Sequence, residues 1–136
     1  KKSSFFPCWL LLNNMEHLTK DFPQLLDSLP AREPTPPFDE AFADAFEHLT
    51  VYFLWRWFLK ASVDGKLFSR VETCVFHVLC IAALFSAQET KDLEVLTRLS
   101  GLYSKEVEHS EENLRLLSRV FERGTLKLSA LLRLLR

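Results

Sequence analysis

The sequence predicts an all-α fold, a single-domain bundle of five or six helices around a central apolar hairpin. Apolar residues recur at three- and four-residue steps along most of the chain. Glycine is scarce, with 3 residues among 136, which favours long helices joined by few turns. A chain of this length buries roughly two thirds of its unfolded surface, so it needs no disulfide or metal for stability. We expect one domain over residues 1–136, with an N-terminal part at 1–37 and a main bundle at 38–136.

The N-terminal part is predicted to be a helix followed by an extended connector. The inward residues of Trp9–Lys20 follow helical spacing. Asp21 can cap a restarted helix, and Pro23 suits its first turn. The segment Leu29–Pro37 holds four of the six prolines, so it cannot be regular helix.

The first residues resemble a secretory signal only in composition. Pro7 and Trp9 interrupt the apolar run, and no small-residue cleavage site follows it. The chain begins with Lys1 and not with Met, so we expect it to be a piece of a longer protein or a chain whose start is missing. The longest uncharged run, Thr73–Gln88, is shorter than the roughly 18 to 20 apolar residues of a membrane span. We therefore expect no transmembrane segment, and the odd number of cysteines without metal or disulfide spacing adds the expectation of a cytoplasmic location.

The segment Phe38–Lys60 is predicted to be the central helix. One apolar face follows three- and four-residue spacing, and from Leu49 onward apolar residues occupy nearly every side. A helix that is apolar all round has neighbours packed around it. Asp64-Gly65 forms a tight turn, and Leu67–Gln88 returns antiparallel as the second arm of the hairpin.

The remaining sequence is predicted to form a long helix and a short one. The apolar spacing continues from Asp92 to Glu122, which indicates one helix. The alternative is a break after His109, with Ser110 capping a new helix. Gly124 ends it, and Thr125–Arg136 forms an amphipathic helix that packs on the bundle or, less often for such a sequence, binds a membrane surface.

Composition excludes several kinds of site. The formal net charge is −1, so nothing indicates nucleic-acid binding. No glycine-rich phosphate loop is present. Cys8, Cys74 and Cys80 form no CxxC pair and are odd in number, which indicates reduced, buried thiols and no metal site formed by this chain alone.

Three polar sets interrupt the apolar helix faces and are the candidates for chemistry. Each contains a histidine, and they are listed here in chain order: His48, Tyr52 and Arg56; Arg70, Thr73 and His77; Glu106, His109 and Asn113. A polar group beside a core must find a partner, because an unpaired one costs roughly 1–3 kcal/mol. The first interpretation is therefore that the sets satisfy one another, with Glu106 paired to Arg56 or Arg70, or to His48 or His77.

The second interpretation is a cleft between helices. Glu106 and His109 would be the acid/base candidates, and Arg56 would hold an anion. Tyr52 and Arg70 are further binding candidates, and Tyr103 is a further catalytic one. No hydrolase triad or HExxH motif supports this interpretation, and the single Glu-x-x-His of Glu106 and His109 lacks the second copy of a di-iron site.

The segments LTVYFLWRWFLKASVDGKLFSRV and LYSKEVEHSEENL resemble the C-terminal part of the flagellin lysine-N-methylase family. The tract Tyr103–Asn113 carries most of this resemblance, and the pattern of Tyr52, Phe53, Arg56 and Phe58 supports it. The resemblance covers roughly Phe38–Phe121. It implies a helical C-terminal domain of a bacterial enzyme that transfers methyl groups to surface lysines of flagellin.

The resemblance also implies S-adenosylmethionine and a cysteine-bound metal centre in the full-length enzyme. The cysteine cluster of that family belongs to its N-terminal half, and the three cysteines here do not reproduce it. Two functions are therefore expected. One is an accessory domain with a scaffolding or substrate-cleft role beside the missing N-terminal half, and the other is a free-standing interaction or dimerisation module that could form a homo-oligomer.

Overall fold

The computed structural model describes residues 4–29 and 40–135, and all regular structure within them is helical. The predicted all-α class is therefore confirmed. The expected number of five or six helices is too low, because the predicted long helix is divided and a further short helix, Ala61–Asp64, follows the predicted Phe38–Lys60. The α-helices are α1 Phe6–Asn13, α2 Asp21–Asp27, α3 Ala43–Trp57, α4 Ala61–Asp64, α5 Leu67–Ser86, α6 Leu93–Tyr103, α7 Glu111–Glu122 and α8 Leu128–Leu132.

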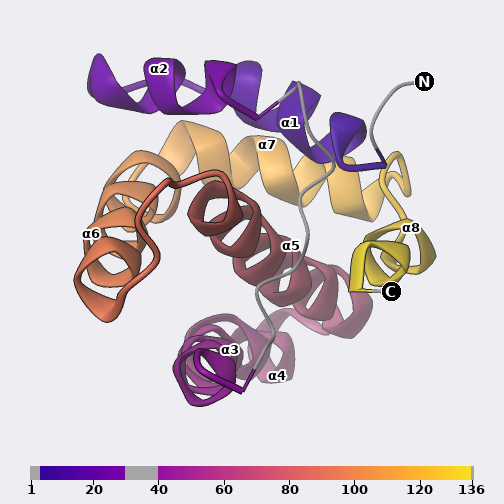
Figure 1. Cartoon of the computed structure of the whole chain (residues 1–136). Coiled ribbons are helices and arrows are strands. Elements are labelled where there is room, and N and C mark those ends of the chain that lie inside the picture. Colours follow the sequence, from indigo (N-terminus) through magenta and orange to yellow (C-terminus); the bar gives the residue numbers. More distant parts are fainter. Residues whose placement is uncertain (1–3, 30–39, 136) are drawn as a thin grey trace.

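Helix α5 occupies the centre of the domain, and the other helices surround it (Figure 1). Nearly every residue from Thr73 to Phe85 is buried. Contacts of α5 reach α3, α6, α7 and α8. This corrects the prediction that Phe38–Lys60 is the central helix: the second arm of the hairpin is the central element, and the first arm lies at the edge.

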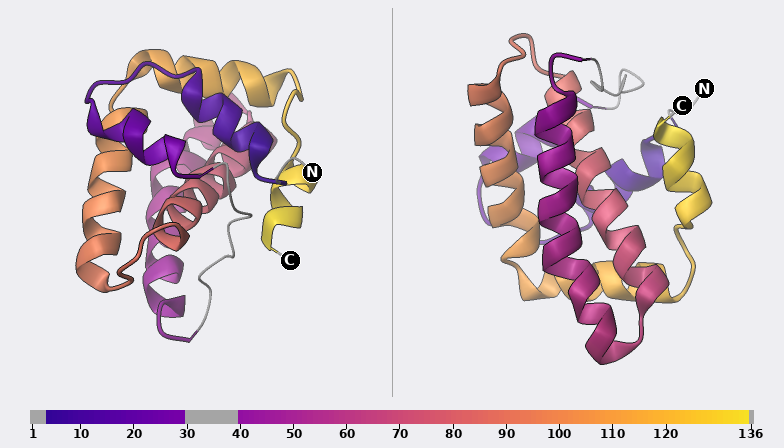
Figure 2. Two further views of the ribbon diagram at one scale, coloured as in Figure 1. Left: turned by 45° about the horizontal axis from the view of Figure 1, so that its top comes forward. Right: turned by 90° about the horizontal axis from the view of Figure 1, so that it is seen from below.

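Helix α3 packs on α5 through one face only. Its buried residues are Phe46, Phe53 and Trp57, and the hairpin with α5 is visible in the right-hand view of Figure 2. The opposite face is exposed, with Trp55 accessible over 67% of its surface. A short 3₁₀ turn, Phe58–Lys60, then leads into α4. From Leu49 onward, apolar residues thus lie on nearly every side of α3, but only the side that faces α5 is buried.

The turn between the hairpin arms follows the prediction. Gly65 has φ of 69°, a left-handed conformation that glycine adopts without a Cβ penalty. The side chain of Asp64 accepts a hydrogen bond of 3.0 Å from the backbone N–H of Lys66. The predicted helix Leu67–Gln88 is observed as α5, two residues shorter at its end.

The N-terminal helices differ from the prediction in their bounds. Helix α1 ends at Asn13, so Trp9–Lys20 is not one helix; a loop over 14–20 connects α1 to α2. Asp21 lies in the first turn of α2 and its side chain makes no cap, which corrects its predicted role. The predicted connector Leu29–Pro37 falls, after its first residue, outside the described residues.

The predicted long helix is divided, and the alternative of a break at His109 is confirmed. After α6 the chain forms a single π-helical turn, Ser104–Glu108, and then changes direction into α7 (Figure 1). Ser110 caps α7, because its hydroxyl accepts a hydrogen bond of 3.2 Å from the N–H of Asn113. Gly124 ends α7 with φ of 65°.

The C-terminal segment packs on α5 as predicted, over a shorter stretch. Helix α8 spans Leu128–Leu132, and the chain continues as a 3₁₀ turn over Arg133–Leu135. Leu131 is buried, whereas Leu132 is 43% exposed. Among the helices in the described part of the chain, α5 alone is long and apolar enough to cross a membrane, and 61% of its apolar window is buried inside the fold. That burial is typical of a core helix.

Candidate functional site

Polar side chains from α3, α5 and the π-helical turn meet at one end of the hairpin. The Nε atom of Arg56 lies 2.8 Å from a carboxylate oxygen of Glu108. The hydroxyl of Tyr52 lies 3.5 Å from both oxygens of the same carboxylate. The Glu108 side chain has no exposed surface, whereas that of Arg56 is 36% exposed. Arg56 therefore has a carboxylate partner, but it is Glu108 and not the predicted Glu106.

The π-helical turn explains how Glu108 reaches this position. The N–H of His109 donates to the carbonyl of Ser104, five residues earlier, at 3.1 Å. A turn with one extra residue is wider than an α-helical turn. As a result the three consecutive residues Glu106, Val107 and Glu108 are all buried. In an α-helix, Glu108 would lie on the exposed side, which is where its spacing with Lys105 and Glu112 places it.

A buried histidine–tyrosine pair lies beside the ion pair. Nδ1 of His77 and the hydroxyl of Tyr103 share a hydrogen bond of 2.7 Å, and both side chains are fully buried. The His77 ring stacks on Phe53 with a centroid distance of 4.8 Å. Burial, and then the neighbouring Arg56 charge, lower the pKa of His77 from 6.5 to about 3. Burial, followed by the neighbouring Cys80, raises the pKa of Tyr103 well above 10.

His77 makes the stability of the fold depend on pH. Its folded pKa of about 3 lies below the ordinary 6.5, so the unfolded chain takes up a proton first as the pH falls. The free energy of unfolding should therefore decline from pH 6.5 towards pH 3, by roughly 2 kcal/mol at about pH 5. Urea unfolding at pH 7 and pH 5 measures the decline, and His77→Gln should remove this part of it. An equal decline in both proteins would contradict this assignment.

Glu106 holds the loop 14–20 against the start of α7. One carboxylate oxygen accepts a hydrogen bond of 2.7 Å from the backbone N–H of Leu18. The other oxygen is buried and accepts no hydrogen bond from any residue that the structure describes. Of the cations within the described ranges, none forms an ion pair with Glu106, so the predicted pairing with Arg56, Arg70, His48 or His77 is wrong.

Asn113 completes the attachment of this loop. Its side-chain oxygen accepts from the N–H of Glu16 at 2.8 Å, and its nitrogen donates to the carbonyls of Glu16 at 2.8 Å and Glu106 at 2.7 Å. The hydroxyl of Ser110 donates to the Glu16 carboxylate at 3.2 Å. Two members of the third polar set, Glu106 and Asn113, thus fix the chain near α1, and Asn113 is the main contributor.

Several predicted site residues lie elsewhere. Arg70 forms a short ion pair with Asp64, the residue before Gly65, and so ties the turn of the hairpin. It also lines a groove of about 420 Å³ between α5 and α7. His48 and His109 are exposed, and Tyr103 is wholly buried. The structure therefore does not bring Glu106, His109 and Arg56 together as a catalytic cleft.

The cysteines are buried thiols. Burial raises the pKa of Cys8 to about 12 and that of Cys74 to about 11, and it raises the pKa of Cys80 well above 9. Thiolate is the form that binds metals and acts as a nucleophile, so these groups are poor in both roles. Within residues 4–29 and 40–135, no cluster of three or more His, Cys, Asp or Glu side chains could hold a metal ion. The chain does not fit the cysteine-bound metal centre implied by the resemblance.

Two important residues were not among the sequence candidates. Glu108 was placed on the exposed side, because a π-helical turn has no recognisable signal in the spacing. Glu16 and its loop lie 97 residues from Asn113, so no local pattern connects them. The helix break itself had a signal, the Ser110-x-x-Asn113 cap, which the structure confirms.

The fold and the polar contacts define a helical domain whose buried polar groups mostly satisfy one another. The family model of the FliB lysine N-methylase C-terminal domain matches residues 12–134, and the chain belongs to this family. The match extends the expected resemblance in both directions, to include α2 and α8. Searches of curated proteins and of solved structures found no match.

Proposed function

We propose that the chain is the C-terminal domain of a bacterial, cytoplasmic lysine N-methylase that acts on flagellin, and that its role there is scaffolding. The observation that carries the proposal is the family match over residues 12–134. The buried polar groups support a scaffolding role because they are engaged inside the domain: Arg56 with Glu108, and His77 with Tyr103.

The methyl donor and any metal centre belong, in this proposal, to the remainder of the methylase. The three thiols of this chain have raised pKa values and are buried, so they do not suit metal ligation. The reacting lysine ε-amino group would be deprotonated and methylated outside this domain. The domain would stabilise the part that performs these steps.

A change at Glu106 tests the scaffolding role against a substrate-cleft role. Glu106→Gln keeps an acceptor for the Leu18 N–H and removes a buried charge, so the free energy of unfolding should change by less than about 1 kcal/mol. In the complete methylase, the variant should transfer methyl groups to flagellin at the wild-type rate. Glu106→Ala serves as the control, since it removes the acceptor and should lower the melting temperature.

The measurements are thermal unfolding of this chain and methyl incorporation into flagellin by the complete enzyme. Unchanged melting together with a loss of methylation in Glu106→Gln would show that Glu106 acts on substrate, and the scaffolding role would be wrong. The free-standing interaction module is the other outcome: it would be favoured if the complete chain of which this domain is part methylates no lysine of flagellin.

A further inference from the structure

The outward side of α3 carries an apolar surface. We call it the outer stripe, and its members share a three- and four-residue spacing: Val51, Leu54, Trp55, Phe58 and Leu59. Their exposed fractions run from 39% at Leu54 to 67% at Trp55. Of thirteen large hydrophobic side chains exposed in the described part of the chain, nine lie between residues 51 and 68. Exposure of apolar residues is therefore concentrated in this region.

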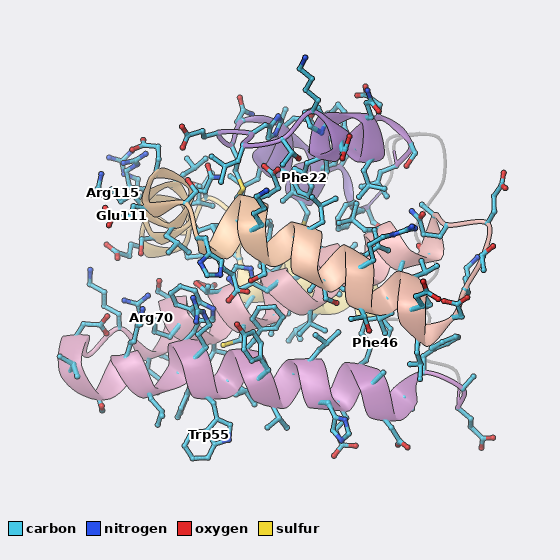
Figure 3. The ribbon with its side chains drawn as sticks, turned by 90° about the vertical axis from the view of Figure 1, so that its left-hand side faces the viewer. Phe22, Phe46, Trp55, Arg70, Glu111 and Arg115 are labelled. Carbon is cyan, nitrogen blue, oxygen red and sulfur yellow. The ribbon has the colours of Figure 1, made fainter. Side chains whose placement is uncertain are left out.

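The outer stripe borders two apolar hollows. One, of about 270 Å³, lies between α3 and α5 and is lined by Leu54 together with Val71, Val75 and Val78. A smaller one, of about 190 Å³, is lined by four members of the stripe: Leu54, Trp55, Phe58 and Leu59. Figure 3 shows Trp55 pointing away from the rest of the domain, while Phe46 of the same helix points into it. The surface offers both a projecting ring and recesses for a partner's side chains.

The outer side of α3 lacks the packing partner that an apolar helix normally has. From Leu49 onward α3 is apolar on nearly every side. Such a helix is normally enclosed by neighbours, and α3 is enclosed on one side only. A contiguous apolar patch of this kind on a protein surface marks a site of contact with a partner. Helix α3 thus has two apolar faces. One packs against α5 of this chain, and the other is exposed.

We infer that the outer stripe is the docking surface for the remainder of the lysine N-methylase, an inference that rests on the proposed function. The family is described as a C-terminal domain, so its natural neighbour is the rest of the same enzyme. Permanent interfaces are apolar at their core, with few charges. The outer stripe itself contains no charged residue, and Arg56 of the same helix is already paired with Glu108, so the partner surface should be apolar.

Two other occupants fit less well. The flagellin substrate must leave after each transfer, and transient interfaces are more polar than this stripe. A second copy of the chain would need about 800 Å² on each partner for a stable interface, and five partly exposed side chains supply only a few hundred. A domain of the same polypeptide needs less area, because the covalent link raises its effective concentration.

The test is thiol labelling at the outer stripe in the complete methylase. Trp55→Cys and Leu59→Cys place reactive thiols in the stripe, while the three native cysteines of this domain are buried. Leu93→Cys is the matched control, because Leu93 is 61% exposed and lies on α6, away from the stripe. Labelling with a maleimide is followed by mass spectrometry of the peptide that contains the new cysteine, in this chain alone and in the complete enzyme.

In the complete enzyme, the thiols of Trp55→Cys and Leu59→Cys should react at least about tenfold more slowly than in this chain alone, at any protein concentration. The control at position 93 should react equally in both. Equal reactivity at 55 and 59 in the two proteins would overturn the inference. Protection that appears in this chain alone as its concentration rises would also overturn it, and would assign the stripe to a second copy.

The same preparations distinguish this inference from the proposed function. Methyl incorporation into flagellin is measured with the unlabelled wild-type enzyme. Activity without protection at 55 and 59 leaves the proposed function standing and removes the docking surface. Protection without activity on flagellin supports the docking surface and removes flagellin as the substrate.

Discussion

Phe53→Ala should lower the free energy of unfolding by about 3–5 kcal/mol. Phe53 is 1% exposed and lies between α3 and α5, with its ring stacked on His77 at 4.8 Å. Removing the ring leaves a cavity that the surrounding helices fill only in part. A loss of this size is a large fraction of the roughly 5–15 kcal/mol that stabilises an ordinary domain. Chemical denaturation monitored by circular dichroism provides the measurement.

Phe58→Ala is the matched control for this prediction. Phe58 is also a phenylalanine, five residues later, but it is 42% exposed and belongs to the outer stripe. Its replacement in this chain should cost less, about 1–2 kcal/mol, since only part of its surface is buried. Equal losses at the two positions, or a loss below about 1 kcal/mol at Phe53, would show that α3 is not packed as described.

The sequence predicted the helices better than it predicted their surroundings. Spacing alone locates the hairpin, its turn at Gly65 and the end of α7 at Gly124, and all three are observed. Spacing shows which faces of a helix are apolar, but it does not show what covers them. Phe38–Lys60 was therefore interpreted as central, whereas the structure leaves the outer stripe exposed. The apolar residues on the outer side of α3 explain both the wrong prediction of a central helix and the proposed docking surface.

The candidate site was predicted in part. The interpretation that the polar sets satisfy one another is right for His77, whose partner is Tyr103, and for Arg56, which has a carboxylate partner. The particular pairing with Glu106 is wrong. A π-helical turn contains one extra residue, which the spacing of apolar residues in the sequence does not reveal. Glu108 therefore faces inward, whereas in an α-helix it would face outward.

The polar network has a consequence for the acid/base interpretation. A general base must reach the proton it removes, and Tyr103 and Glu106 have no exposed surface in this fold. His109 is exposed but has neither residue as a hydrogen-bond partner among the contacts of the described chain. Within the described residues, the tract Tyr103–Asn113, which carries the family resemblance, makes structural contacts. It changes the chain direction and binds the loop 14–20.

Asn113→Ala should have the second large effect, a loss of about 3–5 kcal/mol in the free energy of unfolding. The Asn113 side chain is 1% exposed and makes three hydrogen bonds, two with the backbone of Glu16 and one with the carbonyl of Glu106. Alanine would leave these three backbone groups without their partner, the Glu106 carbonyl in a buried place and the two groups of Glu16 in a partly buried one, and an unpaired buried group costs roughly 1–3 kcal/mol.

The effect of Asn113→Ala should also be local, because the lost bonds attach one loop. In hydrogen-exchange experiments, the amides of Glu16 and Leu18 should lose protection before those of α5. Asn14→Ala is the control: Asn14 is exposed and donates only to Leu10 of its own helix, at 2.7 Å, so its loss should stay below about 1 kcal/mol. If Asn113→Ala melted like Asn14→Ala, the loop 14–20 would not depend on Asn113. The family tract would then need another explanation for its buried asparagine.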